Sequence, residues 1–485
     1  MKVSGWPDII DRIGASWRET TEVLDDWLDD PNTGESLQQH ASTSPDGIDE
    51  ALGVAAATHE RGSWARTPIN ERQLVLTSVA DAIDGRVDEI ARCDAINSGV
   101  PIAVTTLMAR ELGHRFRATA DALDDTRGPR VLGSPARPVY LLRLPLGPAM
   151  IMTAWNASTF IAASRVASAL AAGCPVVLKP SEWAPWGCQI LAEAIVKAGV
   201  PSGAFQLVHG GPLQGSQLVA DPRIRVLSFT GGQAAGRTIA ATAGADFKTV
   251  QLELGGNNPA IICGDANLRQ AAAAIAAGIA KLNGQWCEGP GRIYVQHEMH
   301  DELVSLLLVE LNKLVIGHSL DFETTFGPIA YRKHRDRLIQ QLNMLRDRGG
   351  VTHQPFDVPT AGWYLSPTIV TDLPNNEGLD ELFGPVVTVY RTASDDESLY
   401  LANHPSSGLD AYIFGENIDT CIDIGSQVIA GEVRINGTHL ADLGPNSAQT
   451  FWDSAGIGGH APTAEMVELF RGNRVVGVDD PTAEM

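Results

Sequence analysis

Residues 225–236 read Arg-Val-Leu-Ser-Phe-Thr-Gly-Gly-Gln-Ala-Ala-Gly. The apolar first half predicts a short buried β-strand, and the small residues that follow predict a helix over 231–243. Gly231, Gly232 and Gly236 therefore fall at a strand-to-helix junction, where glycine lets backbone NH groups come close to a phosphate. Such junctions also occur as purely structural turns, so the surrounding pattern has to decide between the two interpretations.

The same alternation of strand and helix continues on both sides of this junction, from residue 145 to residue 253. Apolar runs predict five buried parallel strands, at residues 149–154, 175–179, 205–208, 225–229 and 248–253. Helices are predicted between them, at residues 160–172, 184–198, 211–220 and 231–243. This order is typical of an α/β fold with a doubly wound dinucleotide-binding domain, in which a ligand binds at the carboxyl ends of the strands.

The first part of the chain, up to about residue 120, shows a different pattern. Its apolar residues recur at near-helical spacing, which predicts helices at residues 8–27, 45–58, 70–98 and 100–123. Residues 30–35, with Pro31 and Gly34, predict a turn between them.

The composition is typical of a large soluble enzyme with two or three structural units, since 44% of 485 residues are hydrophobic. The net charge of -22 disfavours nucleic acid and anionic membranes as partners, because both would meet a repelling field. Asn156, Arg165 and Pro175 interrupt the longest apolar stretch, so no membrane span is expected. The N-terminal residues lack the apolar core of a secretion signal, which favours a cytoplasmic location. The six cysteines show no paired spacing and no CxxC motif, so we expect reduced thiols and no metal site.

Two residues carry the chemistry that the sequence suggests. Cys287 lies in Gly-Gln-Trp-Cys-Glu-Gly-Pro-Gly, and Glu253 lies 34 positions earlier in Leu-Glu-Leu-Gly-Gly-Asn-Asn-Pro. A thiol that adds to a carbonyl and a carboxylate that activates water are what covalent oxidation of an aldehyde requires. Taken singly, a cysteine is more often a small buried side chain and a Glu a surface charge.

Both segments resemble the signature segments of the aldehyde dehydrogenase superfamily. Trp155 and Asn156, at the end of the first predicted strand of the nucleotide unit, resemble the Trp-Asn of the family's Pro-Trp-Asn-Phe-Pro segment. The resemblance implies that Cys287 attacks the aldehyde, that Asn156 and the Cys287 backbone NH stabilise the oxyanion, and that Glu253 activates water against the thioester. Without the resemblance, Asn156 would be interpreted as a helix cap.

The family's cofactor segments have counterparts here as well. Residues 179–182 match Lys-Pro-Ser-Glu, residues 381–385 match Glu-x-Phe-Gly-Pro, and residues 229–236 are similar to Phe-Thr-Gly-Ser/Gly-x-x-x-Gly. The resemblance implies NAD as cofactor, with NADP as an alternative, and Trp155, Lys179, Glu182, Gly231, Gly232, Gly236, Glu381 and Phe383 as the residues that bind it. Without it, Lys179 and Glu182 would be a solvated ion pair and Phe383 an ordinary core residue.

The resemblance extends from about residue 30 to the C-terminus and implies an architecture. We expect a dinucleotide-binding domain from residues 1–121 and 146–252 and an α/β catalytic domain from residues 253–440. A small β element for oligomerisation would combine residues 122–145 with the C-terminal segment 441–485. Exposed strand edges in such an element favour a homodimer or homotetramer.

The substrate is expected to be a small-molecule aldehyde with a sizeable apolar or aromatic body. Ala157 and Ser158 replace bulkier family residues and leave room beside Trp155 and Trp286. The sequence shows no clear arginine clamp for an acidic aldehyde, although Arg165 near the expected channel leaves that alternative open. The segment 445–459 departs most from the family pattern, so the identity of the aldehyde stays open.

Two other functions are compatible with parts of the pattern. A CoA-acylating relative would use the same cysteine but generally lacks a Glu at the position of Glu253. A non-catalytic relative that serves in binding would be expected to lose Cys287, Asn156 or Glu253, and all three are present.

Overall fold

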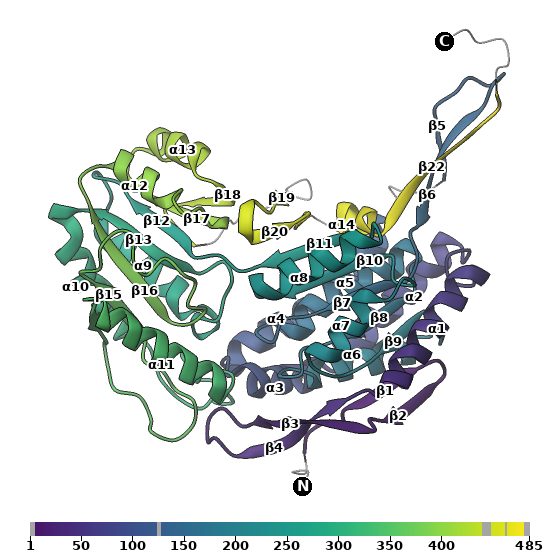
Figure 1. The fold of residues 1–485 in the computed structure, drawn as a ribbon, viewed down its shortest axis with the longest axis horizontal. Coiled ribbons are helices and arrows are strands. Elements are labelled where there is room, and N and C mark those ends of the chain that lie inside the picture. Colours follow the sequence, from purple (N-terminus) through teal and green to yellow (C-terminus); the bar gives the residue numbers. More distant parts are fainter. Residues whose placement is uncertain (1–4, 124–127, 439–447, 461–462, 480–485) are drawn as a thin grey trace.

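The computed structural model of the chain describes residues 5–123, 128–438, 448–460 and 463–479. Two large β-sheets flanked by helices lie side by side, and a narrow three-stranded sheet projects from one end of the molecule (Figure 1). The α/β fold class predicted from the sequence is confirmed.

The first large sheet contains the five predicted parallel strands. They are β7 (Ala149–Met152), β8 (Val176–Lys179), β9 (Phe205–Leu207), β10 (Val226–Gly231) and β11 (Thr249–Leu254). Their order in the sheet is β9-β8-β7-β10-β11, so the direction of winding reverses between β7 and β10. In open sheets of this type, ligands bind beside such a reversal, at the carboxyl ends of the strands.

Alternate residues of these strands pack into two different helical layers. Ile151 and Leu178 belong to a core with the helices on one face, whereas Met150 and Val177 belong to a core on the other face. The first face is covered by α2 (Ile69–Asp84), α3 (Val87–Ser98), α4 (Ile102–Ala122), α5 (Ser158–Ala172) and α6 (Trp186–Lys197). The second is covered by α1 (Pro45–Arg61), α7 (Pro212–Ala220) and α8 (Gln233–Ala245). Strands buried on both faces explain why their sequences are continuous apolar runs.

The helix predicted over residues 8–27 is wrong. The segment forms strands β1 (Ile10–Ile13), β2 (Ser16–Glu19) and β3 (Glu22–Asp29), the last of which pairs with β4 (Ser36–Ser42). Asp11, which falls inside the predicted helix, is buried and accepts a hydrogen bond from Thr43 at 2.7 Å, with His209 3.1 Å away. Partners that are remote in sequence thus override the helical spacing.

The other helices of the N-terminal part form as predicted, with one break. Ser44 accepts from the backbone NH of Gly47 and Pro45 occupies the first turn, which fixes the start of α1. The helix predicted over residues 70–98 is two helices, because α2 ends at Asp84, before Gly85, and α3 starts after Arg86.

The second large sheet follows β11 directly. Its strands are β12 (Asn258–Ile262), β13 (Pro290–Gln296), β14 (Val351–His353), β15 (Thr368–Thr371), β16 (Val386–Thr392), β17 (Gly408–Phe414) and β18 (Ala430–Ile435). Helices α9 (Leu268–Ala280) and α10 (His300–Leu311) pack on one face. Helices α11 (Arg332–Asp347), α12 (Asp395–Ala402) and α13 (Ile418–Gln427) pack on the other.

The projecting sheet is made of β5 (Arg130–Val131), β6 (Val139–Pro145) and β22 (Arg471–Gly477), drawn in blue and yellow in Figure 1. It joins the two segments that were predicted to form an oligomerisation element, although residues 124–127 of the predicted hairpin lie outside the described residues. The C-terminal segment is divided. It also contributes β19 (Gln449–Thr450), β21 (Gly459–His460) and α14 (Thr463–Leu469), and its strand β20 (Gly456–Ile457) pairs with β11 in the first sheet.

Candidate active site

One cavity of about 1220 Å³ runs between the two large sheets and collects most of the predicted site residues. Cys287, Glu253 and Asn156 line it, as do seven of the eight residues predicted to bind the cofactor: Trp155, Lys179, Glu182, Gly231, Gly232, Glu381 and Phe383. The exception is Gly236, which lies inside α8. A Cβ atom at Gly236 would come within 2.5 Å of the Leu254 side chain, so this glycine allows α8 to pack closely on β11.

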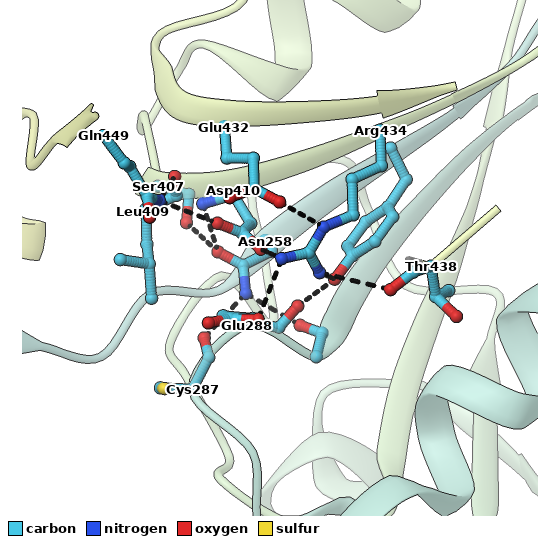
Figure 2. A network of polar contacts seen from close by, with 12 residues as sticks. Asn258, Cys287, Glu288, Ser407, Leu409, Asp410, Glu432, Arg434, Thr438 and Gln449 are labelled. Atoms are coloured by element: carbon cyan, nitrogen blue, oxygen red, sulfur yellow. Dashed lines mark hydrogen bonds and ion pairs between the residues drawn. The ribbon is translucent and has the colours of Figure 1, made fainter. Parts of the chain in front are cut away.

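Cys287 sits in the loop between a 3-10 turn at Lys281–Gly284 and strand β13. The loop is held by Asn258, a completely buried residue whose side-chain NH2 group donates to the carbonyl oxygens of Cys287 at 2.8 Å and Gly289 at 2.9 Å (Figure 2). The Asn258 side-chain oxygen accepts from the Ser407 hydroxyl at 2.6 Å. The amide group of Asn258 thereby fixes the backbone on both sides of Glu288 and orients the thiol.

The thiol of Cys287 lies in an apolar and negatively charged setting. Leu409, Phe451 and Ala455 pack against it from one side. Burial raises the pKa of the thiol well above its ordinary value, and the carboxylate of Glu253 raises this pKa further. Phe451 belongs to the segment that departs from the family pattern, so this segment shapes the cavity wall beside the Cys287 thiol.

Glu253 lies near the end of β11 and is held by a buried arginine. Nη2 of Arg165, on α5, donates to Oε2 of Glu253 at 3.0 Å. The hydroxyl of Thr230 donates to the same oxygen at 3.5 Å. The guanidinium is almost fully enclosed, and burial lowers its pKa, which the charge of Glu253 counteracts.

Asn156 follows β7, and its side chain does not cap a helix. The first turn of α5 is preceded by Ala157 and has no side-chain cap, whereas the Asn156 amide donates to the carbonyl of Gln285 at 3.0 Å. Asn156 therefore ties the end of β7 to the loop that carries Cys287, at a position two residues before Cys287. Its amide group lines the cavity.

Polar groups at the ends of two other strands form the opposite part of the cavity. Lys179, the last residue of β8, donates from Nζ to the carbonyl of Gly210 at 2.6 Å, and Glu182 lies 3.9 Å from the same nitrogen. Gly232 precedes α8, and a Cβ atom added there would meet nothing within 4 Å. The backbone at the start of α8 is thus open to the cavity, which fits a phosphate group at the helix N-terminus.

Aromatic rings form the wall between these strand ends and Cys287. The ring of Trp155 lies 5.4 Å from Phe383 and 5.4 Å from Tyr331, and Tyr331 stacks on Trp183 at 4.0 Å. His334 completes the group, 5.0 Å from Trp155. Tyr331 and Trp183 line the cavity, and His334 packs behind them; none of the three was predicted, because only their position in space, at the start of α11 and after β8, brings them together.

Glu381 reaches the cavity from the loop before β16. Its Oε1 accepts from the backbone NH of Gly256 at 3.2 Å, and burial raises the pKa of Glu381 to about 7. A Cβ atom at Gly255 would lie 2.1 Å from the same carboxylate, so the glycine makes room for it. One loop therefore brings two groups to the cavity, the carboxyl group of Glu381 and the ring of Phe383.

Comparison with known proteins identifies the family to which this chain belongs. The sequence profile of the Aldehyde dehydrogenase family matches residues 19–458. The chain belongs to the aldehyde dehydrogenase family.

Individual relatives support this membership over most of the chain. Aldehyde dehydrogenase 1 of Tanacetum cinerariifolium is 31% identical over 437 residues, which cover 88% of this chain and 86% of that protein. The crystal structure of an NAD-dependent aldehyde dehydrogenase from Sinorhizobium meliloti is similar with a TM-score of 0.90 and 27% identity, covering 98% of this chain and 95% of that one. A betaine aldehyde dehydrogenase double mutant from Staphylococcus aureus, solved with NAD+, gives a TM-score of 0.90 at 25% identity and covers 98% and 97% of the two chains.

In this member of the aldehyde dehydrogenase family, a charged network lies directly behind the loop that carries Cys287 (Figure 2). Arg434, on β18, pairs with Glu288 at 2.8 Å, with Asp410 at 3.0 Å and with Glu432 at 2.6 Å. Its guanidinium also lies over the ring of Trp286, 5.6 Å from the centroid. Arg434 thus contacts both sequence neighbours of Cys287.

This network was not predicted from the sequence. Glu288 directly follows Cys287, and Arg434 lies in the run Gly-Glu-Val-Arg-Ile-Asn at residues 431–436. The charged residue next to Cys287 was the available signal. Only the pairing of β17 with β18 shows that Asp410 and Arg434 are partners.

In the described part of the chain, no group of three or more His, Cys, Asp or Glu side chains could hold a metal ion. Among the helices of the described residues, none is both long and apolar enough to cross a membrane.

Proposed function

We propose that the protein oxidises an aldehyde to a carboxylic acid with NAD, through a thioester on Cys287. The observation that carries this proposal is that a thiol and a carboxylate, Cys287 and Glu253, line one cavity with the open backbone at Gly232. Membership of the aldehyde dehydrogenase family supports it. The solved relative from Staphylococcus aureus binds NAD+, which supports the choice of cofactor.

Each of these residues has its own role in the proposed oxidation. The sulfur of Cys287, as a thiolate that has already released its proton to solvent, forms a bond to the aldehyde carbon, while the Asn156 amide and the Cys287 backbone NH donate to the resulting oxyanion. NAD, when bound, accepts the hydride that this carbon gives up. Glu253 then takes a proton from water, the oxygen of that water bonds to the acyl carbon, and the carbon–sulfur bond breaks. Aldehyde, NAD+ and water are thus converted into acid, NADH and a proton.

Residues around the cavity would hold the cofactor. Lys179 and Glu182 stand where an adenosine ribose fits, and the open backbone at the start of α8 suits a pyrophosphate. Glu381 would bind the second ribose, and the aromatic wall of Trp155 and Phe383 would enclose the nicotinamide. The carboxylate of Glu182 favours NAD over NADP.

The CoA-acylating alternative is less well supported. It has no use for a carboxylate base at the nucleophile, whereas Glu253 is held beside Cys287 by a dedicated ion pair with Arg165. A purely binding function leaves the thiol, the amide and the carboxylate without a role. The apolar residues that line the cavity, among them Met108, Phe160 and Phe451, support an aldehyde with an apolar or aromatic body.

The projecting sheet supports assembly into a homodimer or homotetramer. Val475 on β22 is 63% exposed and Val131 on β5 is 62% exposed, so apolar side chains and strand edges face outward together. Such a surface is stabilised when a second copy covers it.

The Glu253→Gln variant tests the mechanism. We expect it to give a burst of NADH close to one per active site on rapid mixing with aldehyde, followed by very slow turnover, because the amide cannot accept the proton of water. The acyl mass should be found on the Cys287 peptide. The control is Glu302→Gln, at an exposed position of α10, which should turn over like the wild type. Unchanged steady turnover in Glu253→Gln, or an absolute need for CoA in the wild type, would remove Glu253 from this role.

A further inference from the structure

The substrate side of the cavity contains two positive charges that the proposed mechanism does not use. Arg115, on α4, and Lys281, at the end of α9, line the cavity together with Met108 and Phe160. In a chain with a net charge of -22, cations enclosed beside a catalytic thiol would be expected to have acidic partners.

Arg115 has no such partner in the described part of the chain. Its guanidinium lies over the ring of Phe160, 3.9 Å from the centroid, and its enclosed Nε makes no hydrogen bond. Burial, together with the charge of Arg165, lowers the pKa of Arg115 to about 10. Glu111, one turn earlier on α4, acts on this charge only from a distance and forms no ion pair with Arg115 among the described residues.

Lys281 is in a similar position near the nucleophile. Its ammonium lies over the ring of Trp286, 3.6 Å from the centroid, and among the described residues it forms no ion pair. Burial lowers the pKa of Lys281, and Glu288 and Cys287 act on its charge through space.

The carboxylates on this side of the cavity already form ion pairs with other arginines. Glu253 is paired with Arg165 at 3.0 Å, and Glu288 is paired with Arg434 at 2.8 Å. Neither Arg115 nor Lys281 is therefore neutralised by a contact within the described chain. A partly buried cation without a counter-ion is costly, and an anionic ligand would remove this cost.

We infer that the aldehyde substrate carries a carboxylate at the end opposite its aldehyde group, and that Arg115 binds this carboxylate. The inference rests on the proposed function and names its substrate class. Arg115 is the better anchor of the two cations, because its planar fork of NH groups matches a carboxylate. Lys281, closer to the thiol, adds to the positive field that attracts the anion.

This substrate class combines two features of the cavity. The apolar surfaces of Met108, Phe160 and Phe451 suit the body of an apolar or aromatic molecule, as the sequence predicted. The free guanidinium supplies the clamp for an acidic aldehyde that the sequence did not reveal, and it comes from α4 and not from Arg165. Arg165 is engaged by the base Glu253.

Matched pairs of aldehydes test the inference. We expect the wild type to have a higher kcat/KM for 4-carboxybenzaldehyde than for 4-methylbenzaldehyde, and for 4-oxobutanoate than for butanal. Arg115→Met should lower kcat/KM for the carboxylated members roughly 10- to 100-fold, mainly through KM, because a hydrogen-bonded charge pair is lost. The neutral members should change by less than about threefold. Arg115→Lys should recover part of the loss.

The control variant is Arg110→Met, which removes an exposed arginine of the same helix and should leave both members of each pair unaffected. A purely general effect of positive charge would lower activity in both arginine variants alike. A preference of the wild type for the neutral members, or an equal loss for both members in Arg115→Met, overturns the inference while the proposed function stands.

A binding measurement separates this inference from the proposed function. By calorimetry, terephthalate should bind the wild type more tightly than 4-methylbenzoate, and Arg115→Met should abolish the difference. If no aldehyde is oxidised but this difference is found, the proposed function fails and the anion site stands. Equal binding of the two acids to the wild type overturns the anion site.

Discussion

Arg165 and Glu253, 88 positions apart in the sequence, form an ion pair in which Nη2 donates to Oε2 at 3.0 Å. Their side chains are only 3% and 17% exposed. Because α5 carries the arginine and β11 the carboxylate, the pair fixes the direction of the proposed base relative to the first sheet. Only a side chain so anchored can present one oxygen to water at a constant angle.

The Arg165→Met variant should therefore keep the NADH burst but lose turnover roughly 10- to 100-fold, because the carboxylate is no longer held in position for deacylation. Rapid mixing with aldehyde measures both phases. Arg165→Lys should restore part of the slow phase, which a merely destabilised protein would not show. Loss of the burst in a variant that remains folded would assign Arg165 to the attack step instead.

The pH dependence of Cys287 alkylation provides a second prediction. Burial raises the pKa of this thiol well above its ordinary value, and the negative charge of Glu253 raises it further. Glu253→Gln removes that charge, so the pKa falls and alkylation by iodoacetamide becomes half-maximal at a lower pH. Glu302→Gln serves as the control and should leave the midpoint in place. If the midpoint pH of alkylation is unchanged or higher in Glu253→Gln, the charge of Glu253 does not raise the pKa of the Cys287 thiol.

Glu182 should set the choice of cofactor. Its carboxylate lies 3.9 Å from Lys179, where a 2'-phosphate would be repelled. We expect kcat/KM to be on the order of 10- to 100-fold higher with NAD than with NADP. Glu182→Gln should narrow this ratio by raising the activity with NADP. Equal or better activity of the wild type with NADP would refute the prediction.

Arg434 should be a major determinant of stability. Asp410 is completely buried, and burial together with the charge of Glu288 raises its pKa well above the usual range, against the effect of Arg434. Arg434→Met leaves Asp410 and Glu288 without their cation, which should cost about 3–5 kcal/mol in the free energy of unfolding. Denaturant unfolding measures the loss. The double variant Arg434→Met/Asp410→Leu should recover most of it, and a double variant as unstable as the single one would disagree with this account.

Assembly should depend on the projecting sheet. Val475→Asp places a charge in the centre of its exposed apolar surface, so light scattering should report a smaller mass than for the wild type. Leu74→Asp, a similar change at an exposed position of α2, should leave the mass unaltered. The prediction is wrong if the wild type is a monomer or if both variants keep the wild-type mass.

The sequence predicts the first sheet well because each of its strands can be identified from its own residues. A buried strand such as β8 is a short apolar run bounded by turn residues, and its sequence shows this without knowledge of the rest of the chain. Strand β1 does not carry such evidence, since the buried Asp11 depends on His209 and Thr43. A pattern of apolar spacing cannot reveal a polar residue whose partners are remote.

The residues of the candidate site differ in the same way: some can be predicted from their own segment, and others only from their surroundings in the structure. Cys287, Glu253 and Asn156 lie in segments whose amino-acid sequence alone suggests their chemistry, and the structure brings the three residues to one cavity. Arg115 stands in an amphipathic helix among other charged residues, such as Arg110 and Glu111, and looks like one more solvated arginine. Only its placement over Phe160 and the absence of an ion pair among the described residues distinguish it.

The pairing of β20 with β11 has a consequence for how the protein is made. β11 carries the proposed base, and its partner on the outer edge, residues 456–457, comes from the last part of the chain. While the ribosome is still synthesising the second sheet, that edge is unpaired and its backbone groups are open to other chains. Nascent protein would thus hold a nearly complete nucleotide site before it holds a finished catalytic one. Protection of this edge during synthesis, by a chaperone or by delayed folding of β11, would then decide how much newly made chain reaches the active form.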